Sequence, residues 1–233
     1  IYDKTYNKFR FNMSYLWQEF NIKTFPAETL VFRNGIFCPD LSEYESVKYD
    51  ENKNLIKTIK KSKLPVHIIY IGEISGKIDI NIDINIEKSR FFMTAKISNK
   101  KPAFLNIFIK NTGKNSFFDG KIIAKNTGIL EINEISEHIS SNTGIFLKNR
   151  VVAYKNSETV LKGYAKIKKD AVDCDSDISF SVLADNKAKI TMVPTQYINS
   201  VPKSASHSAS LYKPTENQTN YLLFHVFSII IRN

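Results

Sequence analysis

The segment 77–86, KIDINIDINI, constrains the fold more than any other part of the chain. Isoleucine occupies every second position of this run, and aspartate or asparagine occupies most of the positions between. Because side chains of a β-strand point alternately to its two faces, the pattern predicts a strand with one buried face and one solvated face.

The run is one of a series of short β-type segments that begins near residue 64, with turn residues between them. Such a series predicts an all-β domain, for which a sandwich, a barrel and a parallel β-helix are the alternatives. The segments are 66–71, 77–86, 90–97, 103–110, 120–125, 128–135, 144–154, 159–167, 178–184 and 188–193.

The connections between these segments favour the β-helix. Hairpin signals are scarce after residue 40, and Asn-Thr-Gly triplets starting at Asn111, Asn126 and Asn142 recur at 15- and 16-residue intervals. Near-regular rungs with small polar corners are typical of a solenoid. We therefore predict a parallel β-helix whose inward residues include Ile78, Ile80, Ile82, Val151, Val160 and Leu183.

The chain divides into three predicted parts. Residues 1–63 form an N-terminal helical and hairpin segment, whose hairpin turns at Asn34-Gly35. Residues 64–200 form the β-helix core. Residues 201–233 end in an apolar stretch with helical spacing and form a short C-terminal helical segment.

The net charge, the length of the apolar runs and the cysteine content limit the kinds of partner and compartment that we expect. The formal charge of +10 comes from lysines spread along all 233 residues, without an arginine-rich helix, so we expect no nucleic-acid partner. No apolar run reaches the ~20 residues that cross a bilayer, so we expect no membrane partner. Two cysteines far apart in sequence, Cys38 and Cys174, fit a reducing compartment.

Few residues offer chemistry. His207 is a candidate metal ligand, because a neutral imidazole binds iron; its ordinary interpretation is a polar histidine at a strand end. Cys174 is a weaker candidate, because aspartates flank it within D-C-D-S-D and oppose thiolate formation. The pair Asp79 and Asp83 lies on the solvated side of its strand. The chain contains no G-x-S-x-G, Walker loop, H-E-x-x-H or C-x-x-C, so we expect no enzyme.

Two stretches near the C-terminus, 181–198 (SVLADNKAKITMVPTQYI) and 204–223 (SASHSASLYKPTENQTNYLL), resemble the SufB/SufD family. The segment 30–42, LVFRNGIFCPDLS, is similar to an N-terminal segment of SufD sequences. The positions that fall on the family frame are Leu183, Asn186, Lys187, Ala188, Pro194, Ser206, His207, Ala209, Ser210, Glu216, Tyr221 and Leu222.

This resemblance implies a right-handed parallel β-helix core flanked by short helical segments, in a cytoplasmic or plastid-type organellar complex. Its implied partners are a SufB-like subunit, or a second copy as a homodimer, and a SufC-like ATPase. It also implies that an iron–sulfur cluster forms transiently at the interface between two β-helix subunits, with no cofactor held permanently.

Departures from the family pattern indicate which member the chain is like. Ser179 falls where SufB carries an essential cysteine, and Ser208 falls where SufB has a glutamate after the matching histidine. His207 is kept. These features predict a SufD-like, non-enzymatic scaffold with His207 as candidate cluster ligand and Cys174 as a weaker one. After Tyr221 the chain leaves the family frame and stops at Asn233, so contact with the ATPase is the less supported expectation.

A carbohydrate-active or adhesive β-helix protein is the alternative function. Parallel β-helices often act on polysaccharides, and such a protein would present a long groove with carboxylates and aromatic side chains. Asp79 and Asp83 are the carboxylates that this alternative would use.

Overall fold

The computed structural model describes residues 28–34, 36–38, 48–49, 55–57 and 66–215. Every regular element within these ranges is a strand, which confirms the all-β prediction. This described part contains no helix suited to crossing a bilayer. The helix predicted in the N-terminal segment and most of the predicted C-terminal helical segment lie outside the described residues.

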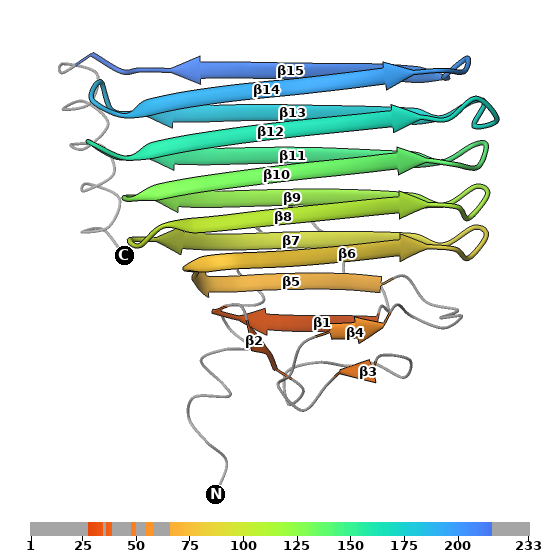
Figure 1. The fold of residues 1–233 in the computed structure, drawn as a ribbon, viewed down its shortest axis with the longest axis horizontal. Helices are drawn as coiled ribbons and strands as arrows, with labels where there is room; N and C mark the ends of the chain where they lie inside the picture. The colour runs from red at the N-terminus through yellow and green to blue at the C-terminus, as the bar shows by residue number, and fades with distance from the viewer. Residues whose placement is uncertain (1–27, 35, 39–47, 50–54, 58–65, 216–233) are drawn as a thin grey trace, which may run out of the picture.

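The strands of the core alternate between two sheets as the chain advances (Figure 1). The first sheet is ordered β15-β13-β11-β9-β7-β5-β1-β2, and the second β14-β12-β10-β8-β6. The strands of the first sheet are β1 (Glu28–Arg33), β2 (Ile36–Phe37), β5 (Val66–Glu73), β7 (Arg90–Asn99), β9 (Phe117–Asn126), β11 (Gly144–Ala153), β13 (Asp175–Ala184) and β15 (Ser204–Tyr212). Those of the second are β6 (Gly76–Ile84), β8 (Ala103–Asn111), β10 (Ile129–His138), β12 (Glu158–Ile167) and β14 (Lys189–Ile198). A separate antiparallel pair joins β3 (Lys48–Tyr49) to β4 (Leu55–Lys57).

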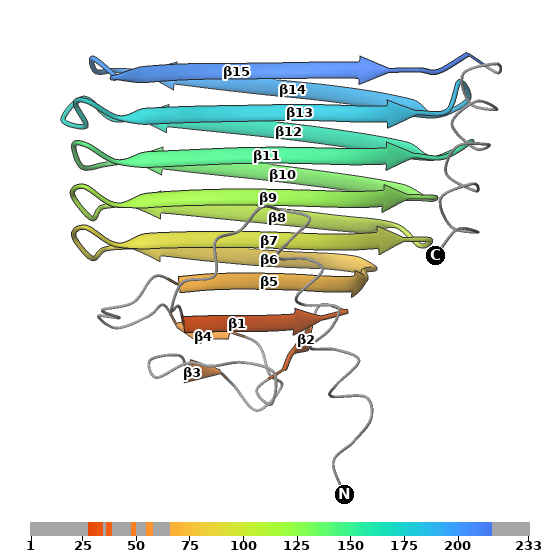
Figure 2. The same cartoon turned by 180° about the vertical axis from the view of Figure 1, so that it is seen from behind.

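Neighbouring strands of the core run parallel, so the two sheets together form a β-solenoid (Figures 1 and 2). Residues one turn apart in the chain lie side by side: Asn106 is 27 residues after Asp79 and pairs with it in register. Parallel strands need crossover connections, and coiling supplies them. The parallel β-helix prediction is therefore confirmed, and the sandwich and the barrel are excluded.

The solenoid interior is filled by the inward face of each strand. Ile80, Ile82 and Val151 are buried there, and Ile78 packs against the same core, as predicted. The largest fully buried side chains include Phe118 and Phe180. The alternation read from KIDINIDINI is thus the alternation that the strand adopts.

Two of the predicted inward residues, Val160 and Leu183, instead point outward. In β12 the buried neighbours are Thr159 and Leu161, and in β13 they are Val182 and Ala184. The prediction was wrong by one residue, which reverses every side chain of a strand. Thr159 can point inward because its hydroxyl accepts a hydrogen bond from Asn126 Nδ2 at 2.7 Å.

The corners that lead from the second sheet to the first share one backbone conformation. One residue at each of four successive corners has a positive φ of 55° to 58°: Lys88, Asn115, Asn142 and Asp173. Backbone bonds connect successive corners, such as Asn142 N to Val172 O at 2.9 Å. Asn and Asp tolerate this left-handed region better than most residues, so small polar corner residues suit it.

Gly113 of the first Asn-Thr-Gly triplet is required for a different reason, which is a close approach to the backbone of the neighbouring turn. A Cβ there would lie 2.3 Å from the Ile86 carbonyl oxygen, so the chain passes too close to backbone for any side chain. The preceding Asn111 is buried at the end of β8, whereas Asn142 occupies a left-handed corner. The triplets therefore mark corners, as predicted, but their members have different structural roles.

The boundaries of the core differ from the prediction at both ends. The predicted hairpin is present, since β1 pairs antiparallel with β2 across Asn34, but β1 also pairs parallel with β5. The first sheet thus begins before residue 64. Beyond residue 200 the chain forms β15, where the C-terminal helical segment was expected to begin.

Candidate functional site: the open C-terminal end of the solenoid

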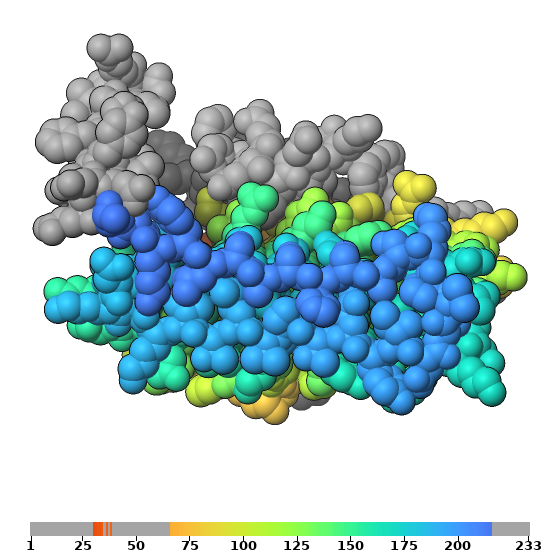
Figure 3. Space-filling model, turned by 90° about the horizontal axis from the view of Figure 1, so that it is seen from above, coloured from red at the N-terminus to blue at the C-terminus, as the bar shows by residue number. Residues whose placement is uncertain are grey.

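The last turn of the solenoid consists of β14 and β15, which lie uppermost when the molecule is seen from above (Figure 3). Each is the outermost strand of its sheet, so neither pairs on its far side with another described strand. We call this end, with the side chains between the two strands, the terminal face. Exposed backbone N–H and C=O groups of an edge strand are a template for pairing with another chain. Pro194 is compatible with β14 because that strand is an edge.

The inward side chains of successive strands stack in columns along the solenoid. These inward columns end at the terminal face. His207 is the register partner of Ile178, Ala209 of Phe180 and Leu211 of Val182, and the β13 member of each pair is buried. His207, Ala209 and Leu211 therefore occupy core positions, yet they are exposed because no described strand lies above them. From β14, Gln196 Nε2 donates to the Ser206 carbonyl at 2.7 Å and links the two strands across the opening.

His207 thus occupies an inward position of β15, at the end of the solenoid that no described strand covers. Its ring makes no hydrogen bond to another residue of the described chain. An imidazole that is exposed and unbonded on an edge strand is free to bind a group carried by a second molecule. The candidate ligand therefore lies at the open end of the described solenoid.

The serines beside His207 point the opposite way, to the outer face of the first sheet. Their hydroxyls bond to β13 one turn below: Ser206 to Asp177 at 2.7 Å, Ser208 to Ser179 at 3.0 Å and Ser210 to Ser181 at 2.9 Å. These hydrogen bonds form a polar ladder between β13 and β15. The serine hydroxyls therefore have a structural role, because they link the last two strands of the sheet.

Ser179 and Ser208, the two positions at which the chain departs from SufB, are register partners and hydrogen-bond to each other. The 29 residues between them hide this contact in the sequence. The resemblance to SufB would put a thiol and a carboxylate at these two positions, and this chain has two hydroxyls. A hydroxyl neither forms a persulfide nor replaces a thiolate as an iron ligand, so this pair lacks sulfur chemistry.

Cys174 lies apart from His207, in a small buried cluster with Ile167 and Ala171. Its Sγ is 3.2 Å from Thr143 Oγ1, which is in turn 2.8 Å from His138 Nδ1. The thiol is fully buried, and burial lowers the pKa of His138 to about 4, so that imidazole is neutral at neutral pH. The sequence did not reveal this His–Thr–Cys contact, because its three members lie on different corners and strands. The thiol is closed to solvent, as a structural corner cysteine would be.

No group of three or more metal-ligating side chains exists among the residues that the structure describes. On the described terminal face, the side chain suited to iron is the His207 imidazole. Any further ligands of a cluster would have to come from outside this face.

Glu134 is a further buried ionisable group, and the sequence pattern did not indicate its burial. It lies in the core on β10, and Asn149 Nδ2 of β11 donates to its Oε2 at 2.9 Å. Burial raises the pKa of the Glu134 carboxyl to about 8, so it is mostly protonated at neutral pH. It lies below the last turns and is separate from the terminal face.

One carboxylate of the carbohydrate alternative, Asp79, is engaged in other contacts. Asp79 accepts from Asn106 Nδ2 at 2.7 Å and forms an ion pair with Lys77 at 3.0 Å, and these contacts lower its pKa. Asn106 Oδ1 accepts in turn from Asn133, so Asp79 ends a polar ladder on the outer face of the second sheet. This carboxylate is part of that ladder.

The fold and this open end define a class of protein: a parallel β-solenoid subunit with exposed terminal strands. The family model for the SUF system FeS cluster assembly SufBD core domain matches residues 74–224. That range covers more than half of the chain, so the chain belongs to the SufBD family and is involved in iron–sulfur cluster assembly. No curated protein sequence matches it.

Proposed function

We propose that the chain is a SufD-like, non-catalytic scaffold subunit whose terminal face docks on a SufB-like subunit or a second copy. The observation that carries the proposal is His207, an exposed core-position histidine on the last strand, next to hydroxyls at the SufB thiol and carboxylate positions. The chain keeps a nitrogen ligand but offers no sulfur acceptor there, so it depends on its partner for thiolates.

The iron–sulfur cluster is cargo in this proposal, formed transiently between the two subunits. The His207 imidazole supplies one nitrogen ligand, and cysteines of the partner supply the others. The chain itself carries out no reaction and holds no permanent cofactor. A SufC-like ATPase completes the complex, in the cytoplasm or a plastid-type organelle.

The family membership supports this function over the carbohydrate alternative, and the engaged Asp79 carboxylate gives that alternative no acid–base pair. Two features support docking through the terminal face. The edges of β14 and β15 are unpaired within the described chain, and the apolar side chains of Leu211 and Ile198 are exposed beside them.

The test is co-expression with a SufB-like subunit and a SufC-like ATPase, followed by iron and sulfide analysis of the purified complex. We expect His207→Ala to lower iron and sulfide per complex while complex yield and the unfolding midpoint stay unchanged. Ser210→Ala is the matched control, because Ser210 lies on the same strand and points to the other face. Unchanged cluster content in His207→Ala would refute the role of His207, and failure to co-purify any partner would refute the scaffold itself.

A further inference from the structure

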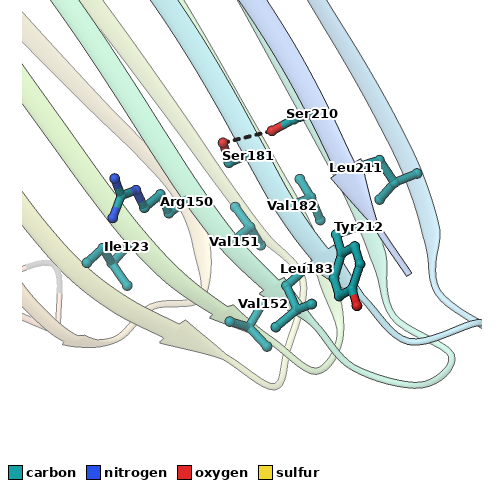
Figure 4. A pocket seen from close by; sticks show the side chains of 10 residues that line it. All are labelled: Ile123, Arg150, Val151, Val152, Ser181, Val182, Leu183, Ser210, Leu211 and Tyr212. Atoms are coloured by element: carbon teal, nitrogen blue, oxygen red, sulfur yellow. Dashed lines mark hydrogen bonds between the residues drawn. The ribbon is translucent and has the colours of Figure 1, made fainter. Parts of the chain in front are cut away.

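A shallow apolar groove lies on the first sheet, near the carboxyl ends of its last strands (Figure 4). Val152, Leu183 and Tyr212 form one outward column across β11, β13 and β15, and each is more than a third exposed. Ile123 and Leu211 extend the apolar lining. A column of large apolar side chains on the outer face of a solenoid is costly to leave in water.

The serine hydroxyls that line the groove are already hydrogen-bonded, so they do not require a polar ligand. The hydroxyls of Ser181 and Ser210 bond to each other at 2.9 Å (Figure 4). Arg150 is the charged side chain of the lining, and it forms no ion pair within the described part of the chain. The groove therefore suits an apolar segment with an acidic residue near one end.

The sequence that follows β15 has this composition. Tyr212 both lines the groove and ends β15, and only three described residues separate it from Glu216. Glu216 is the one acidic residue of 216–233, and between Tyr221 and Ile231 every residue except His225 and Ser228 is apolar. From Tyr212, four extended residues reach about 13 Å, whereas Arg150 lies two strands away and two residues back along the strand direction, about 12 Å.

Length and family membership agree with this match. A helix over the apolar stretch 221–231, which its spacing predicts, would be about 16 Å long, and the groove crosses three strand spacings, about 14 Å. The family's core-domain match extends past the end of β15 to residue 224, so the family core includes the first part of this segment.

We propose that residues 216–233 dock in this groove and cover Val152, Leu183 and Tyr212. The covalent link places the segment at an effective concentration in the millimolar range, which favours it over any separate chain. The inference is independent of the proposed function, because its groove lies mainly on the outer face of the first sheet and shares only Leu211 with the terminal face. It also assigns the C-terminal segment a binding site within its own subunit.

The test is limited proteolysis of the full chain with chymotrypsin, which cleaves after residues such as Tyr221 and Phe224, with intact mass as the readout. When opening is fast, cleavage follows the open population, so we expect Leu183→Asp to speed cleavage within 216–233 about tenfold. Ile135→Asp is the matched control, because Ile135 is similarly exposed on the outer face of the second sheet. It should leave this cleavage rate unchanged.

A variant of the segment gives the reciprocal test. Phe224→Asp should raise exchange of the segment's amides with deuterium, and the double variant with Leu183→Asp should exchange no faster than either single variant. Equal cleavage in the wild type and Leu183→Asp would overturn the proposal. So would equal acceleration by Ile135→Asp, or a segment protected only when a partner protein is present.

Discussion

Replacing Glu134 by glutamine tests the buried carboxyl of the solenoid core. Its folded pKa of about 8 lies above its ordinary value of 4.5, because burial disfavours the charged form. A raised acid pKa contributes stability that is fully present below pH 4.5 and is lost as pH rises to about 8. With about 1.36 kcal/mol per pKa unit, the loss between pH 5 and pH 8 is about 3–4 kcal/mol.

The measurement is urea unfolding of the wild type and Glu134→Gln at several pH values from 5 to 8. The amide keeps an oxygen that can accept from Asn149 Nδ2 but does not ionise. The difference between the two unfolding free energies should therefore shift by about 3–4 kcal/mol in favour of the variant as pH rises from 5 to 8. Other titrating groups contribute equally to both proteins and cancel.

Glu137→Gln is the matched control, since Glu137 lies three residues farther along the same strand and forms an ion pair with Lys168 on the outer face. Its free-energy difference should vary far less with pH. A Glu134→Gln difference that stays constant across this range would show that the carboxyl ionises in place, and the assignment of Glu134 to a dry core would fail.

Two more predictions concern stability. Gly113→Ala should cost about 1–3 kcal/mol, because its Cβ would lie 2.3 Å from the Ile86 carbonyl oxygen; a thermal shift no larger than that of Lys114→Ala at the same corner would contradict the close approach. Leu161→Ala should cost about 2–5 kcal/mol in urea unfolding, whereas the adjacent Val160→Ala should cost about 1 kcal/mol or less, since only Leu161 points into the core. Equal costs would mean that the strand has the opposite face inward.

The sequence predicted the fold where its pattern was unambiguous. In KIDINIDINI only one face can be buried, so the strand and its inward side followed directly. In S-V-L-A, residues 181–184, both Val182 and Leu183 are apolar, and composition does not say which of them enters the core. The strand resolves this through its neighbours, because Val182 stacks on the buried Val151.

The candidate site was only partly predictable for a different reason. His207 was found through a family frame, but its contact partners depend on register. The offset between stacked residues is 27 from Asp79 to Asn106 and 29 from Ser179 to Ser208, so no fixed period gives the pairing. For the same reason the pairing of Ser179 with Ser208, the burial of Glu134 and the His138–Thr143–Cys174 contact appear only once the turns are stacked.

The most direct test of the scaffold proposal blocks the terminal face without disturbing the core. Ala209 is an exposed residue in an inward column of β15, so Ala209→Arg places a large charged side chain on the open end, whereas Ser208→Arg places it on the outer face of the same strand. Co-purification with a SufB-like subunit is then measured for both variants. We predict that Ala209→Arg loses the partner while remaining folded, and that Ser208→Arg retains it. Full retention of the partner by Ala209→Arg would contradict docking through the terminal face.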